Sequence, residues 1–307
     1  MTSTSVEPTR SLPIKQEENY SFSLVIPCYN EEDAIVSTVE QIESLLEPLQ
    51  PFELIMIDDG SKDRTGSLLD DLASARDSLR IIHHEKNKGY GAALKSGVVA
   101  AKSDLIGITD ADGTYPTKSL IDLLTFTDTN DMVVGARTGQ NVEYSKIRKI
   151  PKVFLSSYAS WIAGQRIPDL NSGMRVFKRE LALRYLHMLP DGFSFTTTIT
   201  LAHMINNRPV YFHPIDYKRR IGKSKIQPIR DTLRFVQLIA RMGMYFAPLR
   251  VLAPIVFVLS ILFFGSLIYD VFYIKNLTDK TVMLLMFTMN TAIFGLLADM
   301  IDKRTRT

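Results

Sequence analysis

Residues 105–113 read LIGITDADG, an apolar run that ends in two carboxylates and a glycine. A short run of this kind predicts a buried strand followed by a turn. Two similar runs come earlier, FSLVIP at 22–27 and FELIMI at 52–57, and the second is followed by the acidic turn DDGS at 58–61. A fourth run, LRIIH, occupies residues 79–83. The first part of the chain therefore predicts strands whose ends carry polar turns.

Apolar residues at helical spacing separate these strands, over roughly 34–46, 65–75 and 91–101. Strands that alternate with helices predict an α/β fold with a mostly parallel sheet that is covered on both faces. Ligands of such sheets bind at the carboxyl ends of the strands. Further short strands are expected at 132–135 and 176–177, and Val210–Tyr217 is expected to be an edge strand.

The last sixth of the chain is far more apolar than the rest. Residues 249–274 and 282–301 are long enough to cover roughly 39 Å and 30 Å as helices, which predicts two transmembrane spans. Polar residues recur at helical spacing just before them, which predicts an amphipathic interfacial helix over 227–248. Nine Lys or Arg and one acid lie between Lys218 and Arg250. Such a basic block suits an anionic membrane surface and places both termini in the cytoplasm.

These patterns divide the chain into five parts. They are a disordered tail at 1–20, an α/β domain at 21–226, an interfacial helix at 227–248, two transmembrane helices within 249–302 (249–274 and 282–301), and a basic tail at 303–307. The net charge of +3 is too small to indicate nucleic acid as a partner. The single cysteine, Cys28, excludes an intrachain disulfide and a cysteine-based zinc site. A homo-oligomer is compatible with the sequence.

Asp110 and Asp112 form the strongest candidate for a metal site. Carboxylates two residues apart at a strand end can both reach one hard cation, which also takes diphosphate oxygens as ligands. We therefore expect Mg²⁺ or Mn²⁺ here. An acidic turn alone is a weak signal, but a second one, Asp58-Asp59, ends an earlier strand.

Asp58 and Asp59 have two interpretations that are compatible. One acid accepts hydrogen bonds from a nucleobase or a ribose, while the rest of the turn caps the following helix. The loop NKGYG at 87–91 precedes a helix, where a phosphate could approach the backbone. It lacks both the dinucleotide and the P-loop glycine patterns, so neither NAD nor ATP is inferred.

Basic residues recur after the acidic motif. The run RRIGKSK at 219–225 combines dense charge with a glycine next to the membrane segment, and suits a lipid-borne phosphate or a leaving diphosphate. The candidate ligands of an acceptor phosphate are Arg137, Arg148, Arg175, Arg219, Arg220, Ser224 and Lys225.

Taken together, the motifs resemble family-2 glycosyltransferases of the GT-A fold, and more closely the dolichol-phosphate mannose synthases and the bacterial polyprenyl-phosphate glucosyltransferases. The resemblance covers roughly 22–226 and includes VIPCYNEE at 25–32, DLNSGMR at 169–175 and GKSK at 222–225, in addition to the motifs above. The paired C-terminal spans match the membrane-anchored members.

The resemblance implies a role for each position. Pro27, Tyr29, Glu31 and Asp59 would hold the base and ribose, and Lys88 would lie near the donor. Asp110 and Asp112 would hold the metal and diphosphate, and Asp169 would lie close to the transferring carbon. This makes Asp112 and Asp169 the candidate catalytic residues. Arg137, Arg148, Arg220 and Ser224 would bind the acceptor phosphate.

The expected activity is therefore inverting transfer of a hexose from a UDP- or GDP-sugar to a polyprenyl phosphate at the membrane. One alternative is a related transferase with a hydroxyl acceptor on a glycolipid or polysaccharide, which needs a general base and has Asp169 as its clear candidate. A non-catalytic scaffold subunit is a second alternative, and the intact acidic motifs argue against it. A dinucleotide-dependent oxidoreductase is disfavoured by the missing glycine pattern.

Overall fold

The computed structural model describes residues 21–49, 51–139, 146–217 and 228–305. Seven strands form one sheet in the order β3-β2-β1-β4-β6-β5-β7. The strands are β1 (Phe22–Cys28), β2 (Phe52–Asp58), β3 (Leu79–His83), β4 (Leu105–Ile108), β5 (Met132–Ala136), β6 (Arg175–Lys178) and β7 (Val210–Pro214). All pairings are parallel except those of β6, which runs antiparallel to β4 and β5. The predicted mostly parallel α/β sheet is confirmed, and β7 lies at its edge as expected.

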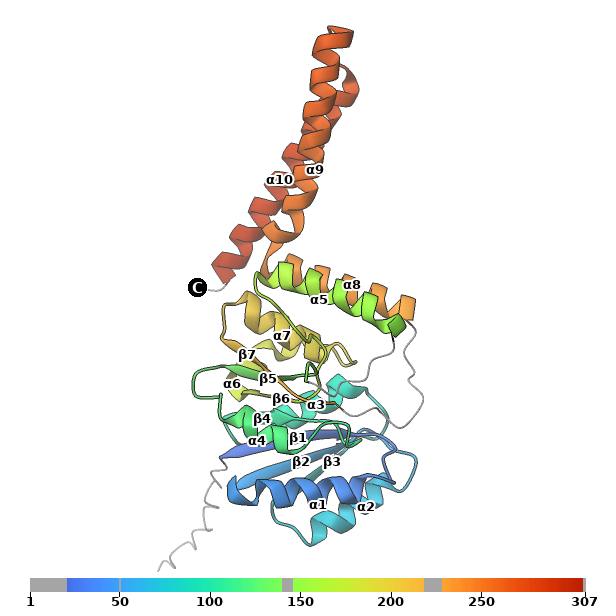
Figure 1. The fold of residues 1–307 in the computed structure, drawn as a ribbon, viewed down its shortest axis with the longest axis vertical. Coiled ribbons are helices and arrows are strands. Elements are labelled where there is room, and N and C mark those ends of the chain that lie inside the picture. The colour runs from blue at the N-terminus through green and yellow to red at the C-terminus, as the bar shows by residue number, and fades with distance from the viewer. Residues whose placement is uncertain (1–20, 50, 140–145, 218–227, 306–307) are drawn as a thin grey trace, which may run out of the picture.

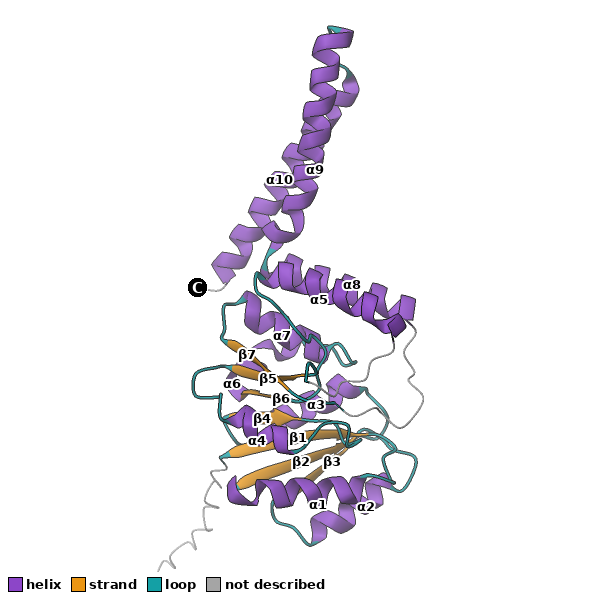
Figure 2. Cartoon of the chain, viewed as in Figure 1, coloured by secondary structure: helices purple, strands orange, loops and turns teal. Residues whose placement is uncertain are grey.

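Helices cover both faces of the sheet (Figure 2). They are α1 (Ile35–Leu46), α2 (Thr65–Ser74), α3 (Tyr90–Ala100), α4 (Lys118–Leu124), α6 (Arg179–Tyr185) and α7 (Phe195–Ile205), with short 3₁₀ turns at Glu47–Leu49 and Leu186–Met188.

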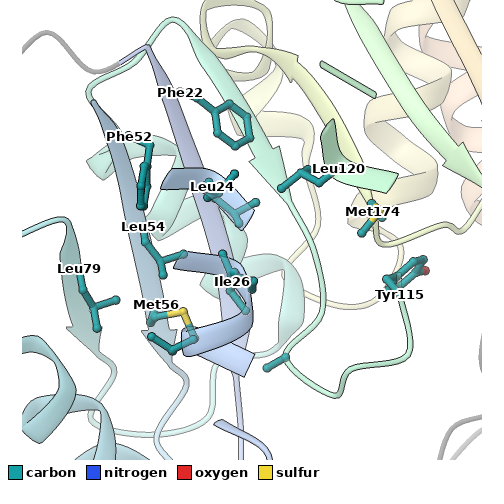
Figure 3. Packing of buried hydrophobic residues seen from close by; sticks show 14 of the residues in the cluster. Phe22, Leu24, Ile26, Phe52, Leu54, Met56, Leu79, Tyr115, Leu120 and Met174 are labelled. Carbon is teal, nitrogen blue, oxygen red and sulfur yellow. The ribbon is translucent and has the colours of Figure 1, made fainter. Parts of the chain in front are cut away.

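The central strands are largely apolar because both of their faces are buried. Leu24 and Ile26 of β1 pack with Leu54 and Met56 of β2 on one face (Figure 3). The intervening residue Val25 packs in a second cluster on the opposite face, with residues of β2 and α3. Alternate side chains of one strand thus enter different cores, as the pleat requires.

Two further helices, α5 (Lys146–Ala163) and α8 (Pro228–Phe246), lie side by side across the end of the domain nearest α7 (Figure 1). Ile162 of α5 and Ile239, Met242 and Phe246 of α8 are buried in a third apolar cluster. The opposite sides of the pair carry exposed large apolar side chains, namely Phe154, Trp161, Leu233 and Tyr245. The helix expected at 227–248 is therefore present, and it has a partner in α5.

The chain ends in a hairpin that projects away from the sheet domain (Figure 1). Helix α9 (Pro248–Tyr269) continues through a π-helical turn at Asp270–Ile274, and α10 (Asp279–Thr305) returns along it. By length and composition, Pro248–Ile274 and Asp279–Ile301 can each cross a membrane, with mean hydropathies of 2.7 and 1.8. Only 6% and 11% of these segments is buried, so they are unlike the core helices of a soluble domain.

One polar contact fixes the hairpin to the sheet domain. The guanidinium of Arg250, in the first turn of α9, donates to the carbonyl of Ile162 at 2.8 Å, near the end of α5. Gly164 ends that helix with a φ of +72°, and a Cβ there would lie 2.7 Å from the Arg250 guanidinium. The absence of a side chain at Gly164 is therefore what lets Arg250 reach the end of α5.

Candidate active site

The polar residues predicted from the sequence lie together at the end of the sheet where the parallel strands have their carboxyl termini. Asp58 ends β2, Asp110 and Asp112 follow β4, and Arg137 follows β5. Because these strands run in one direction, their carboxyl ends lie together. The antiparallel strand β6 begins at this same end, so the segment just before it, which contains Asp169, also arrives there.

The carboxylate of Asp110 is held between a tyrosine and a glycine. The hydroxyl of Tyr90 donates to its Oδ1 atom at 2.9 Å. A Cβ on Gly173 would lie 2.9 Å from both carboxylate oxygens, so Asp110 sits directly on that glycine. Burial raises the pKa of Tyr90 well above its usual value, and the charge of Asp110 adds to the effect. Tyr90 therefore stays protonated and remains a donor.

Asp112 is held by the turn that follows it. The hydroxyl and the backbone N–H of Thr114 donate to its Oδ1 atom at 2.7 and 3.1 Å, and Gly113 between them has a φ of +65°. A cavity of about 90 Å³ lies beside the turn and is lined by Asp110, Gly113 and Tyr115, among others. Both acids thus have neutral hydroxyl donors that fix their orientation.

The chemistry of these two acids fits a hard divalent cation. Within the described ranges, no cluster of three or more His, Cys, Asp or Glu is arranged to hold a metal. Magnesium in particular is usually held by one or two carboxylates and completed by waters and substrate phosphates, rather than by a full protein cage. The side chains of Asp110 and Asp112 are of the kind that such a partial site requires.

Asp58 and Asp59 are both engaged by the protein itself. Asp58 accepts the N–H of Ser61 at 2.9 Å and pairs with Nδ1 of His83 at 3.1 Å. Asp59 is 3% exposed and accepts the backbone N–H groups of Lys88 and Gly89 at 2.9 and 2.8 Å. The acidic turn therefore orders the glycine-rich loop, a role that the sequence interpretation did not assign to it.

The loop after β1 lies against the same turn. The N–H of Asn30 donates to Ser61 Oγ at 3.0 Å, and the N–H of Glu31 donates to Thr65 Oγ1 at 2.8 Å. Pro27, Tyr29 and Glu31, which were predicted to hold the base and ribose, are half-buried here, while Lys88 is exposed. The structure thus gathers the predicted donor residues in one place.

Asp169 and Arg137 are bonded directly to each other. Arg137 donates to the two carboxylate oxygens through Nε at 2.7 Å and a terminal nitrogen at 2.9 Å, and its backbone N–H adds a third bond at 3.0 Å. Asp169 is fully buried, and the Arg137 guanidinium lies 5.2 Å from the ring centre of Tyr217. The predicted catalytic acid and a predicted phosphate ligand are thus bonded to each other.

Arg175 requires a correction of its predicted role. Its side chain is fully buried and donates to the carbonyls of Ser172 and Thr196 and to the hydroxyl of Thr200. Burial lowers its pKa to about 10, so it stays charged at neutral pH. An arginine enclosed in this way joins the start of β6 to α7 and is not presented to an acceptor phosphate. The sequence could not reveal this, because burial of an arginine is rare.

The remaining predicted phosphate ligands cannot be placed. Arg219, Arg220, Ser224 and Lys225 lie outside the described residues, and so does the side chain of Arg148 on α5.

Several residues near the site were missed or set aside at the sequence level: His83, His84, Tyr90, Thr114 and Phe193. A signal was present for the histidines. In adjacent parallel strands, His83 is in register with Asp58, so the two histidines at the end of β3 lie beside the two acids at the end of β2.

Comparisons with known proteins agree with this geometry. Residues 23–186 match the profile of Glycosyl transferase family 2, and residues 247–303 match that of the GtrB C-terminal hairpin. The chain is 29% identical over 262 residues to an undecaprenyl-phosphate 4-deoxy-4-formamido-L-arabinose transferase of Pseudomonas fluorescens, covering 80% of this chain and 72% of the relative.

Two other relatives are similar over different lengths. A dolichyl-phosphate hexose transferase of Haloferax volcanii is 28% identical, over 67% of this chain and 86% of the relative. A dodecaprenyl-phosphate galacturonate synthase of Rhizobium johnstonii is 25% identical, over 98% of this chain and 93% of the relative.

Among solved structures, the fold resembles glucosyl-3-phosphoglycerate synthase from Mycobacterium tuberculosis, crystallised with Mn²⁺, uridine diphosphate and glucosyl-3-phosphoglycerate. The TM-score is 0.54 at 21% identity, over 77% of this chain and 84% of that one. This similarity concerns the fold, which is the GT-A arrangement expected from the sequence.

Proposed function

Because this chain belongs to glycosyl transferase family 2, we propose that it transfers a hexose from a UDP- or GDP-sugar to a polyprenyl phosphate at a membrane surface, with inversion at the anomeric carbon. The relatives named above support the acceptor, since their names share a polyprenyl or dolichyl phosphate and differ in the sugar.

The observation that carries this proposal is the pairing of Asp169 with Arg137. A hydroxyl acceptor must lose a proton during attack and needs a base. Asp169, the expected base, is fully buried and has both oxygens bonded to Arg137. A phosphate monoester needs no base, because its second pKa lies near 6 and it is largely a dianion at pH 7.

On the donor side, Pro27, Tyr29, Glu31, Asp58, Asp59 and Lys88 would surround the nucleoside. Asp110 and Asp112 would hold the cation and the diphosphate. A divalent cation bound there offsets the charge that develops on the leaving diphosphate. Tyr90 and Thr114 keep the two carboxylates oriented toward it.

On the acceptor side, α9 and α10 would span the bilayer, and the exposed apolar sides of α5 and α8 would lie at its surface. The sheet domain and both termini would face the cytoplasm. The basic segment at 219–225 comes just before α8 in the sequence, and its positive charge would favour a lipid-borne phosphate. Arg137, Arg148, Arg219, Arg220, Ser224 and Lys225 stay candidates for that contact.

The decisive assay offers polyprenyl phosphate and the matching polyprenol to the full chain in lipid, with radiolabelled UDP- and GDP-sugars. We expect label to enter the phosphate and not the alcohol. Glycosylation of the alcohol alone would replace this proposal with the hydroxyl-acceptor alternative.

A further inference from the structure

Phe193 is an aromatic side chain that the sheet domain leaves open to solvent. It is 76% exposed, more than any other large apolar side chain described between residues 21 and 217. It lies in the loop just before α7, on the side where α3 begins. Single exposed apolar residues are common on protein surfaces, but Phe193 lies next to the start of α3, where Tyr90 contacts the predicted site.

The loop that carries Phe193 is fixed in place by α3. The N–H of Ala92 donates to the carbonyl of Asp191 at 3.1 Å, and Lys95 donates to the carbonyl of Leu189 at 3.2 Å and pairs with Asp191. A Cβ on Gly89 would lie 2.6 Å from the Asp191 carbonyl oxygen. The glycine-rich loop thus lets the backbone before α7 approach the start of α3.

The ring of Phe193 stacks on Tyr90, with 5.6 Å between ring centres and 21° between planes. The hydroxyl of Tyr90 in turn donates to Asp110 at 2.9 Å. A direct line of contacts therefore joins the open ring of Phe193 to the carboxylate that we assign to the donor diphosphate.

We propose that Phe193 forms the surface on which the sugar ring of the nucleotide-sugar donor rests, an inference that depends on the proposed function. The hexose is covalently attached to the diphosphate, so it must lie close to Asp110. One face of a pyranose exposes C–H groups with partial positive charge, and such a face stacks on the negative face of an aromatic ring. Tyr90 stacks on Phe193 and donates to Asp110, so it links the position of the ring to that carboxylate.

The geometry favours a sugar over the isoprenoid tail of the acceptor. A long isoprenoid needs a continuous apolar track, and that surface is provided by α5, α8 and the hairpin. Phe193 is a single ring, and in the described part of the chain its only ring contact is Tyr90. One aromatic ring matches the dimensions of one pyranose.

The test compares each nucleoside diphosphate with its own sugar conjugate on the full chain in detergent. The probes are UDP with UDP-glucose and GDP with GDP-mannose, and the pair that the wild type binds is used throughout. Phe193→Ala should weaken the nucleotide-sugar about tenfold while the affinity for the diphosphate changes less than about twofold. Phe193→Tyr keeps the ring and should restore sugar binding.

Val99→Ala is the matched control. Val99 is exposed on α3, the helix that begins at Tyr90, but it lies nine residues further along, near the opposite end of that helix. It should change neither affinity. Equal losses for diphosphate and nucleotide-sugar in Phe193→Ala would mean that the ring only supports the loop, and the proposal would fail. An unchanged donor affinity with a raised KM for polyprenyl phosphate would assign Phe193 to the lipid instead.

These outcomes are separate from a failure of the proposed function. If the wild type binds a nucleotide-sugar but glycosylates only a hydroxyl acceptor, the polyprenyl-phosphate proposal fails, and the sugar surface at Phe193 is still judged by the paired affinities. If the wild type binds neither conjugate more tightly than its diphosphate, the sugar surface itself is refuted.

Discussion

Nδ1 of His84 lies 2.7 Å from Oδ1 of Asp59, and both side chains are buried. The other ring nitrogen of His84 is 2.9 Å from the hydroxyl of Ser96 on α3. The imidazole therefore links the acidic turn after β2 to the helix that follows the glycine-rich loop. Asp59 is in this way placed to hold Lys88 and Gly89, and His84 is placed to hold Asp59.

The first prediction concerns this link. His84→Ala removes one partner of a buried carboxylate and leaves a small cavity. The free energy of unfolding should therefore fall by about 2 kcal/mol. The affinity for the donor should fall as well, because the loop at 87–91 loses its support. Thermal unfolding and donor titration on the same samples measure both effects. His83→Ala, at a more exposed position, should cost clearly less stability, and equal losses in the two variants would contradict the assigned role.

The second prediction concerns Asp169 and Arg137. Removing one partner leaves the other charge poorly compensated in a buried site. Each single alanine substitution should therefore lower the free energy of unfolding by about 3–5 kcal/mol. The double variant should cost less than the sum, and a double-mutant cycle from denaturant unfolding measures the coupling. Asp169→Asn should keep measurable transfer to polyprenyl phosphate. Complete loss of turnover in a folded Asp169→Asn protein would indicate an essential base.

The third prediction concerns the metal. Asp112→Ala should abolish transfer with little effect on stability, since Asp112 is a half-buried turn residue whose side chain adds little to the apolar core. Excess chelator should do the same to the wild type, and Mg²⁺ or Mn²⁺ should restore it. Full turnover in chelator would exclude a divalent cation from the reaction.

The fourth prediction concerns the glycine beneath Asp110. Gly173→Ala places a methyl group against both carboxylate oxygens and must displace them. A displacement of about 1 Å at a reacting centre can cost on the order of 100-fold in rate. Steady-state turnover at saturating donor measures this. Gly192→Ala is the matched control, because a Cβ there meets nothing within 4 Å, and its unfolding midpoint should match that of the wild type.

The fifth prediction is a pH effect on stability from His203. Burial lowers its pKa from 6.5 to about 4, despite a hydrogen bond to the carbonyl of Ile199. The unfolded chain binds a proton near pH 6.5 and the folded chain does not, so stability is lost as the pH falls from 6.5 toward 4. The full effect is roughly 3 kcal/mol.

His203→Asn removes this titration and can keep the bond, because Asn206 on the same segment already donates to a carbonyl four residues back. Its unfolding midpoint should therefore fall less than that of the wild type between pH 7.5 and pH 5. The exposed His187→Asn variant should follow the wild type. Parallel curves for His203→Asn and wild type would refute the assignment.

The sequence predicted most of the sheet because each central strand is a short apolar run that ends at a polar turn. β3 is found where it was expected, and β2 differs by one residue. The reversed direction of β6 was not predicted, since Arg175–Lys178 contains no feature that sets strand direction. Its direction is fixed by pairing with β4 and β5, which lie far away in the sequence.

The site was predicted in part for a similar reason. Acidic turns such as Asp110-Ala111-Asp112 are visible in one segment, so they can be recognised without a structure. The support from Tyr90, Gly173 and Phe193 joins three segments that are distant along the chain, and only tertiary packing reveals it. Arg175 was assigned wrongly for the same reason. Its charge suggested a phosphate ligand, but its buried position, which only the fold reveals, gives it a structural role.

The bond between Arg250 and the end of α5 has a mechanical consequence. If the hairpin spans a bilayer, as proposed above, a flexible linker would let the sheet domain swing above the membrane, whereas a bond at the first turn of α9 restricts that motion. The distance between the site and the membrane surface would then vary less than it would with a flexible linker. If the acceptor is a polyprenyl phosphate, as proposed above, its head group would then have to reach the site without a large swing of the sheet domain, and head-group packing would affect how easily the acceptor arrives.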